Sequence, residues 1–193
     1  MLKNTHEHHQ QVATHERLSS FRVAAIQMAS GPSVSANLEE AARWIEEAVT
    51  QQAQLVVLPE YFCIMGMKDT DKLAVREHPG EGPIQKFLSD TAKRHRIWLV
   101  GGSVPLATSD PNKVYNSCLV YADNGELAAR YDKIHLFGLQ LGNEHYAEEK
   151  TIKAGDKVVT VDSPFGRMGL SICYDLRFPE LFRNMNKVDI ILA

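Results

Sequence analysis

The segment Leu55–Leu58 is apolar at every position, without the alternation of polar and apolar side chains that a half-exposed strand would show. Continuous apolarity over such a short run predicts a strand that is buried on both faces. A second apolar run, 168–172, also predicts a strand. A strand buried on both faces needs cover on both sides, so the chain is expected to fold into layers.

Helices and strands alternate in the first half of the chain, and turn signals become frequent in the second. Amphipathic spacing predicts one helix that begins near Asn37, taken as an N-cap, and another that begins at Pro83. Turn residues predict hairpins around 123–125 and 163–166, whereas the charged stretch 138–156 is expected to be a long loop. Further strands are expected at 23–28, 97–104 and 188–192, and a short helix at 180–185. This order favours the α/β class with a mixed sheet covered by helices.

The composition is that of an ordinary soluble globular protein, with 44% hydrophobic and 23% charged residues. A net charge of −3 gives no support to nucleic-acid or anionic-membrane binding. No apolar run approaches the ~20 residues that a membrane helix needs, and the N-terminus lacks the apolar region of a secretory signal. The three cysteines are odd in number and lack Cys-x-x-Cys spacing, which favours a reducing cytoplasm over a disulfide framework or a zinc site.

Residues 1–20 are polar and are expected to form a disordered extension. A metal-binding tract is the alternative, because the segment contains several histidines, but their irregular spacing and the lack of cysteine argue against it. A single domain is expected over 21–193. The chain stops directly after an apolar strand, which would leave apolar surface uncovered, so a shortened chain or a fragment is expected.

The apolar run 168–172 stops at a single thiol, Cys173, and Pro179 opens a new amphipathic pattern soon afterwards. This arrangement is typical of a strand-to-helix elbow, which holds a nucleophile clear of the sheet and close to free backbone N–H groups. A catalytic thiol also needs a base for its proton and a cation nearby. Glu60 and Lys133 each follow another apolar strand, so the three groups together predict one active site.

Each of these groups also has a purely structural interpretation. A lone cysteine is most often packed in a core, which is how Cys63 and Cys118 are interpreted. Glutamate and lysine most often lie at the surface. It is the combination of thiol, carboxylate and ammonium at three strand ends that favours catalysis.

Three segments also carry a family resemblance. Leu58–Glu60, Tyr131–Phe137 and Cys173–Glu180 resemble the three motifs of the nitrilase, or carbon–nitrogen hydrolase, superfamily, and they occur in the order that the family requires. The resemblance extends from Phe21 to Ala193. The run that starts at Cys173 is similar to that of the small amidases, a branch that includes deaminated-glutathione amidase and the ω-amidases.

The resemblance implies an α-β-β-α sandwich, in which two sheets pack face to face with helices outside. It implies that Cys173 is the nucleophile and Glu60 the general base, and that Lys133 and the backbone N–H of Tyr174 stabilise the oxyanion. No metal or organic cofactor is expected. Family members usually continue for several dozen residues beyond the point where this chain stops, and they commonly associate. A domain incomplete at its C-terminus and a homodimer are therefore expected.

The family also has a second carboxylate between the lysine and the cysteine. The candidates here are Glu144, Glu148 and Glu149, and the match of 148–155 to the corresponding family segment favours Glu148. That carboxylate would orient Lys133 or the substrate amide. Three acidic residues close together are also what an ordinary solvated loop contains.

Two further residues are candidates for substrate binding. Tyr61, next to Glu60, is a candidate for lining the acyl pocket, although aromatic residues at strand ends usually belong to the core. Arg177 either binds a substrate carboxylate or pairs with Glu180. His135 is interpreted as a structural residue with satisfied hydrogen bonds.

The expected activity is that of a cysteine-dependent amidase acting on a small, linear, carboxylated amide through a thioester. A nitrile hydrolase or an N-carbamoyl amino acid hydrolase with the same three groups is the nearest alternative. A remnant without activity, which only binds ligands or partners, is an alternative from another class.

Overall fold

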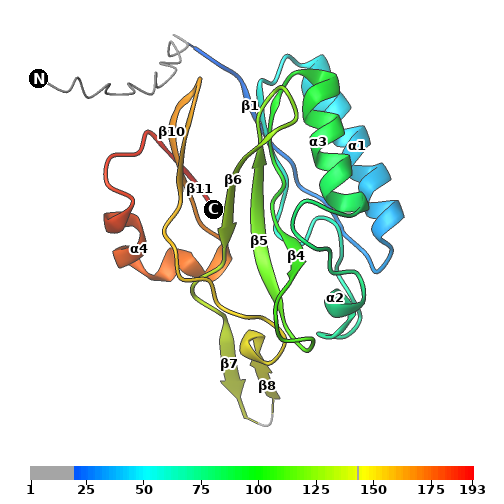
Figure 1. Ribbon diagram of the computed structural model, residues 1–193, viewed down its shortest axis with the longest axis vertical. Coiled ribbons are helices and arrows are strands. Elements are labelled where there is room, and N and C mark those ends of the chain that lie inside the picture. Colours follow the sequence, from blue (N-terminus) through cyan, green and yellow to red (C-terminus); the bar gives the residue numbers. More distant parts are fainter. Residues whose placement is uncertain (1–19, 143) are drawn as a thin grey trace, which may run out of the picture.

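The computed structural model describes residues 20–142 and 144–193 (Figure 1). The polar extension expected at 1–20 lies, apart from Ser20, outside the described residues. The helices are α1 (Val34–Thr50), α2 (Asp71–Ala74), α3 (Pro83–His95) and α4 (Pro179–Asn184), with 3-10 turns η1 (Glu148–Lys150) and η2 (Cys173–Arg177). The strands are β1 (Val23–Ala25), β2 (Leu55–Val57), β3 (Trp98–Val100), β4 (Val104–Ala107), β5 (Val114–Tyr121), β6 (Leu127–Asp132), β7 (Gly138–Leu141), β8 (Glu144–Ala147), β9 (Thr160–Ser163), β10 (Gly166–Leu170) and β11 (Ile190–Leu192).

The larger sheet has six strands, arranged around β5. Strands β1, β2 and β3 run parallel, because helical crossovers connect them. Strands β3 and β4 pair antiparallel with successive parts of one edge of β5, and β6 pairs antiparallel with the other edge. Strand β6 therefore runs in the same direction as β2, and both strands end at the same edge of the sheet.

The single strand expected at 97–104 is in fact two strands, β3 and β4, separated by 101–103. The break lies at Gly102, whose φ is +48°. A Cβ at this position would lie 1.9 Å from the carbonyl oxygen of Pro59, so only glycine fits. The close approach brings the end of β3 against the segment that leads to Glu60.

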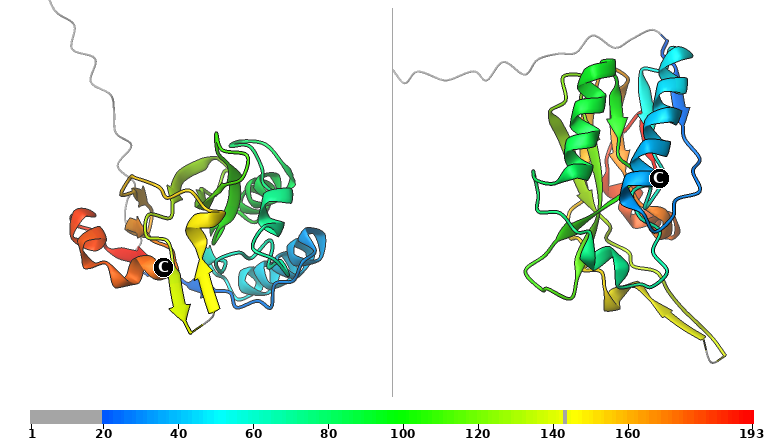
Figure 2. Two further views of the ribbon diagram at one scale, coloured as in Figure 1. Left: turned by 90° about the horizontal axis from the view of Figure 1, so that it is seen from below. Right: turned by 90° about the vertical axis from the view of Figure 1, so that its right-hand side faces the viewer.

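The smaller sheet has β10 at its centre, antiparallel to β9 and parallel to β11. Figure 1 shows α1 and α3 on the outer face of the larger sheet, the smaller sheet against its inner face, and α4 beyond the smaller sheet. The end-on view in Figure 2 shows the same layers. The expected α-β-β-α sandwich is confirmed.

Two apolar cores hold these layers together. The first lies between the helices and the larger sheet, and the second lies between the two sheets. Val56 belongs to the first core and Leu55 to the second, so neighbouring residues of β2 point in opposite directions, as the continuous apolarity of this strand predicts. Full burial of such a side chain contributes roughly 2 kcal/mol. Prominent members of the first core are Ile45, Phe62, Leu88 and Leu99, and of the second Tyr131, Met168, Leu170 and Ile172.

The first helix begins earlier than its capping pattern predicts. Ser33 is the N-cap of α1, and its side chain accepts a hydrogen bond from the backbone N–H of Ala36. Asn37 lies inside the helix and is buried. Its side-chain amide accepts from the N–H of Gly31 and donates to the carbonyl oxygens of Gly31 and Cys63. Asn37, which the sequence predicts as the cap, therefore holds the loops that contain Gly31 and Cys63 against α1.

The prediction of a long loop over 138–156 is also wrong in part, because β7 and β8 form a two-stranded hairpin that is followed by η1. Figures 1 and 2 show the hairpin projecting from the body of the molecule. The side chains of β7 are all exposed, so pairing here requires no contact with a core. A strand pair of this kind leaves little apolar signal in a charged stretch. No helix among the described residues is long and apolar enough to cross a membrane.

Candidate active site

The three chemical groups predicted from strand ends follow β2, β6 and β10. Lys133 comes directly after β6, Glu60 lies three positions after the last residue of β2, and Cys173 lies three positions after the last residue of β10. The Nζ of Lys133 is 3.1 Å from Oε1 of Glu60. Glu60 and Cys173 both line one cavity. The structure therefore brings together the three residues that the sequence placed in one site.

Lys133 is fully buried and lies between two carboxylates. In addition to its contact with Glu60, its Nζ lies 3.0 Å from both carboxylate oxygens of Glu148. Burial alone would lower the pKa of Lys133, but the charges of Glu60 and Glu148 and their hydrogen bonds outweigh burial and raise the pKa above its ordinary value. The ammonium is therefore charged at neutral pH.

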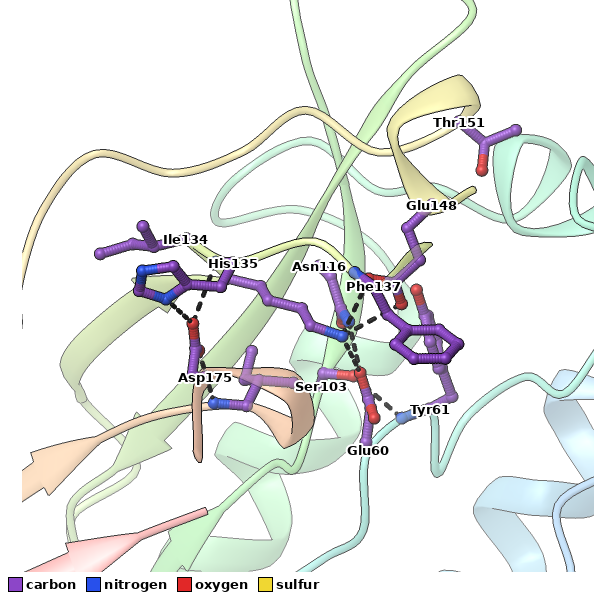
Figure 3. Close-up of polar contacts among 12 residues, drawn as sticks. Glu60, Tyr61, Ser103, Asn116, Ile134, His135, Phe137, Glu148, Thr151 and Asp175 are labelled. Atoms are coloured by element: carbon purple, nitrogen blue, oxygen red, sulfur yellow. Dashed lines mark hydrogen bonds and ion pairs between the residues drawn. The ribbon is translucent and has the colours of Figure 1, made fainter. Parts of the chain in front are cut away.

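Glu60 is held through one of its two oxygens. The Nδ2 of Asn116, from β5, donates to Oε1 at 2.8 Å, and Lys133 contacts the same oxygen. Neither contact uses Oε2. Asn116 itself is completely buried, and its Oδ1 has no hydrogen-bond partner among the described residues. Figure 3 shows Asn116 and Glu148 reaching the same small region as Glu60 from different elements.

Of the acidic candidates whose side chains the structure describes, Glu148 is the one that lies in the site. It begins η1, and its Oε2 accepts a hydrogen bond of 2.7 Å from the backbone N–H of Phe137. Its own N–H donates to the carbonyl oxygen of Phe137. Glu149 is exposed, and the side chain of Glu144 lies outside the described set. The contact with Phe137 places Glu148 opposite the residues that immediately follow Lys133.

Cys173 has a backbone φ of +49°, in the left-handed region that non-glycine residues seldom adopt. Its side chain is exposed, in contrast to the buried Cys63 and Cys118. Partial burial, followed by the charge of Glu60, raises the pKa of the Cys173 thiol, and Lys133 opposes this effect. The thiol is therefore protonated at neutral pH and needs a base to act as a nucleophile. The strand-to-helix elbow predicted here is a strand followed by a 3-10 turn, and α4 starts only at Pro179.

The cavity has a volume of about 300 Å³. Glu60 and Cys173 are polar groups in its wall, and most of the remaining wall is apolar. This volume lies at the small end of the range for ligand sites, so the cavity suits a small molecule. The apolar part of the wall includes Val57, Val100, Ile172, Leu176 and Leu192.

Two residues predicted to bind substrate do not line this cavity. The ring of Tyr61 packs under Lys72, whose Nζ is 5.3 Å from the ring centroid. Arg177 is exposed, and its alternative partner, Glu180, contacts Arg183 instead. Burial, together with the charges of Glu148 and Glu60, raises the pKa of the Tyr61 hydroxyl well above its ordinary value, so Tyr61 lies close to the two carboxylates without lining the cavity.

Lys72 is a charged residue near the site that the sequence did not single out. It lies on α2, is buried, and its Nζ is 3.4 Å from Oγ1 of Thr151. Burial lowers the pKa of Lys72, and the charges of Asp69 and Glu148 oppose that shift. In the sequence Lys72 belongs to a run of charged residues, which looks like a solvated surface. Among the described residues no group of three or more histidine, cysteine or acidic side chains could hold a metal ion.

Comparison with known protein families matches residues 22–193 to the carbon-nitrogen hydrolase family. The chain belongs to this family. The carbon-nitrogen hydrolase chain is 44% identical to a human omega-amidase over 166 residues, which are 85% of this chain and 58% of that protein. It is 39% identical to a deaminated glutathione amidase of Synechocystis over 175 residues, which are 88% of this chain and 63% of that protein.

Solved structures agree with this assignment. The crystal structure of Saccharomyces cerevisiae Nit3, a member of the nitrilase superfamily, matches with a TM-score of 0.72 and 34% sequence identity. The match covers 83% of this chain and 58% of that chain. The chain spans about half to three-fifths of the length of the curated relatives. These comparisons establish the family and the fold of the matched segment.

Proposed function

We propose that this chain carries the catalytic site of a cysteine-dependent amidase. The observation that supports this function best is the buried ammonium of Lys133, held between the carboxylates of Glu60 and Glu148 beside a cavity that Cys173 also lines. Acyl transfer needs a nucleophile, a base for its proton and a cation for the oxyanion. All three kinds of group are present within one small region.

The first half of the reaction forms a thioester. Glu60 takes the thiol proton as the sulfur of Cys173 attacks the amide carbon, and negative charge moves to the carbonyl oxygen. Lys133 and the backbone N–H of Tyr174 stabilise that charge, and Tyr174 suits this task because the first N–H groups of a helical turn have no partner within the turn. The C–N bond then breaks, and Glu60 returns the proton to the departing nitrogen, which leaves as ammonia.

The second half hydrolyses the thioester. Glu60 takes a proton from water, and the water oxygen attacks the thioester carbon. The bond between carbon and sulfur breaks, the acid product leaves, and the proton returns to Cys173. The raised pKa of this thiol fits the scheme, because a protonated sulfur requires the base that Glu60 supplies in both halves.

We propose a small, linear amide that also carries a carboxylate as the substrate. Two relatives are named as an omega-amidase and as a deaminated glutathione amidase. The small and mostly apolar cavity fits a short aliphatic chain. Arg177 is exposed in the turn that begins at Cys173 and lies outside the cavity wall, so it is the proposed partner of a substrate carboxylate that extends beyond the cavity. Replacing Arg177 by Met should then raise KM with little change in kcat.

The test compares four kinds of substrate with the same protein: an α-keto-acid amide, deaminated glutathione, a nitrile and an N-carbamoyl amino acid. We expect turnover of an amide, and its loss in C173A and C173S. The matched control is C63A, because Cys63 is buried in the core between the helices and the larger sheet. Amide hydrolysis that persists in C173A would refute the assignment of Cys173 as the nucleophile. Turnover of only the nitrile or the carbamoyl compound would refute the proposal that the substrate is an amide. A fully folded protein without any turnover would refute the proposal that the chain is an active enzyme.

A further inference from the structure

Asp175 is a completely buried carboxylate that accepts four hydrogen bonds. Its Oδ1 accepts from the backbone N–H of His135 at 3.0 Å and contacts Nδ1 of the same residue at 2.7 Å. Its Oδ2 accepts from the hydroxyl of Tyr131 at 2.6 Å and from the backbone N–H of Ile172 at 2.9 Å. Figure 3 shows Asp175 between His135 and the elbow.

The partners of Asp175 flank the two residues of the site that must meet. Tyr131 and His135 lie two positions before and two positions after Lys133 in the chain. Ile172 directly precedes Cys173, and Asp175 follows it by two positions. One carboxylate therefore connects the segment that carries the cation to the turn that carries the thiol.

We propose that Asp175 is a positioning residue that holds Cys173 in register with the Glu60–Lys133 pair. The proposal rests on the proposed function only where activity is concerned. The Nδ1 of His135 adds a second contact to the one that its backbone N–H makes with the same carboxylate oxygen. The imidazole ring of His135 also stacks on the ring of Phe178, at 3.7 Å between centroids and an interplanar angle of 8°. These two contacts hold the ring of His135 between Asp175 and Phe178.

The conformation of the elbow explains why such a connection is needed. Cys173 adopts a φ of +49°, a conformation that is strained for a residue with a side chain and persists only where the surroundings enforce it. Five residues of 3-10 turn supply few hydrogen bonds of their own. The bond from Ile172 N–H to Asp175 closes this turn, and the bonds from Tyr131 and His135 fix it to the end of β6.

Replacing Asp175 by Asn tests the connection with little change in shape. Each oxygen of the carboxylate accepts two hydrogen bonds, so an NH₂ group in place of either oxygen faces two donors. Whichever way the amide turns, one side of the connection is lost, either the one to His135 or the one to Tyr131 and Ile172. The matched control is E77Q, because Glu77 is also buried and accepts from the backbone N–H groups of Ile84 and Gln85 at the start of α3.

The deciding measurement is the rate at which iodoacetamide alkylates Cys173 at neutral pH, followed by peptide mass spectrometry below the melting temperature of every variant. Glu60 assists alkylation by taking the thiol proton, so E60Q should slow it by roughly 10²-fold, as for a positioned base. D175N should slow it by a similar factor. The double variant E60Q/D175N should be no slower than either single variant, because a displaced thiol no longer benefits from Glu60. In the E77Q background the effect of E60Q should remain complete.

Several outcomes would overturn the proposal. Alkylation of D175N at the rate of the unaltered protein would do so, and so would E60Q and D175N effects that multiply in the double variant. If D175N does not fold, Tyr131→Phe removes one of the four donors without changing a charge, and it should weaken the dependence of alkylation on Glu60. An undiminished dependence in that variant would also overturn the proposal.

Kinetics with an amide substrate provide the second readout. D175N should lower kcat by roughly 10²-fold, the effect of a small misplacement of reacting groups, with KM changed by less than about threefold. An unchanged kcat would contradict the positioning role. If the unaltered protein hydrolyses no amide, the proposed function fails, whereas the alkylation rates still decide the role of Asp175.

Discussion

Nζ of Lys133 lies 3.1 Å from Oε1 of Glu60, in a place where only 1% of the lysine side chain is exposed. In the proposed reaction this contact weakens each time Glu60 takes a proton, because the carboxylate then loses its charge. Glu148 contacts the same ammonium with both oxygens and takes no proton in the proposed scheme, so in that scheme it keeps Lys133 charged at the moment when the oxyanion forms. In the proposed reaction, Glu60 therefore transfers protons and Glu148 maintains the charge of Lys133.

Replacing Lys133 by Met should destabilise the protein by about 3–5 kcal/mol, because Glu60 and Glu148 would lose the cation between them. It should also lower kcat for amide hydrolysis by about 10²–10³-fold, the usual cost of losing one oxyanion donor. Urea unfolding at pH 7.5 measures the first effect. Unchanged stability of K133M would show that the two carboxylates do not depend on this lysine.

Replacing Lys72 by Met should have the opposite effect on stability. A folded-state pKa below the ordinary value of 10.5 means that the folded protein binds this proton less tightly than the unfolded chain, so the charge of Lys72 costs stability at neutral pH. K72M should therefore change the free energy of unfolding by between zero and a gain of about 2 kcal/mol. The difference from the unaltered protein should narrow as the pH rises towards 10.5. A large loss of stability at pH 7 would contradict this reasoning.

The buried thiol of Cys118 gives a prediction for alkaline pH. Burial raises its pKa from the ordinary 9.0 to about 12, so its contribution to stability is complete below pH 9 and is lost as the pH rises towards 12. The stability advantage of the unaltered protein over C118A should be constant below pH 9 and should shrink by about 2 kcal/mol at pH 10.5. Urea unfolding of both proteins under a reducing agent measures the difference. An advantage that is independent of pH would show that this thiol ionises in the folded protein.

Gly102→Ala should destabilise the protein by more than ~1 kcal/mol, because φ is +48° and the new Cβ would lie 1.9 Å from the carbonyl oxygen of Pro59. The matched control is Gly142→Ala, at φ +58° with no atom within 4 Å of the added Cβ. G142A introduces a side chain at a positive φ, as G102A does, but its new Cβ meets no other atom. Thermal unfolding should therefore show a clearly larger loss for G102A, and equal losses in the two variants would rule out the collision. G102A should also slow amide hydrolysis, because Pro59 precedes Glu60.

The positions of Glu60 and Cys173 could be predicted because each residue follows a strand with a local apolar pattern, whereas Lys133 follows the more polar β6, which the turn at 123–125 helps to locate. Strands β2 and β6 run in the same direction and end at the same edge of the sheet. The order of strands along the chain therefore predicts that the residues after them lie close together. Glu148 could be favoured only through the family resemblance, since three glutamates in one charged stretch look alike.

Other parts of the site could not be predicted because they depend on contacts between distant segments. Asp175 looks like an ordinary turn residue until its contacts with Tyr131 and His135 are known, 44 and 40 positions away. Lys72 lies in a charged run but is buried against Tyr61. Asn37 resembles a helix cap in the sequence, yet its side chain bonds the backbone of Gly31 and Cys63 in neighbouring loops. In each case long-range packing overrides the local pattern.

The β7–β8 hairpin has a consequence for the residues at its base. A ribbon of two strands without a covering layer is only marginally stable, so its amides should lose their protection against hydrogen exchange before those of either sheet. Ala147 ends this ribbon, and Glu148 is the next residue. Glu148 is anchored to the backbone of Phe137 and to Lys133, so we expect local unfolding of the hairpin to stop at this residue, with the buried lysine limiting how far the opening spreads.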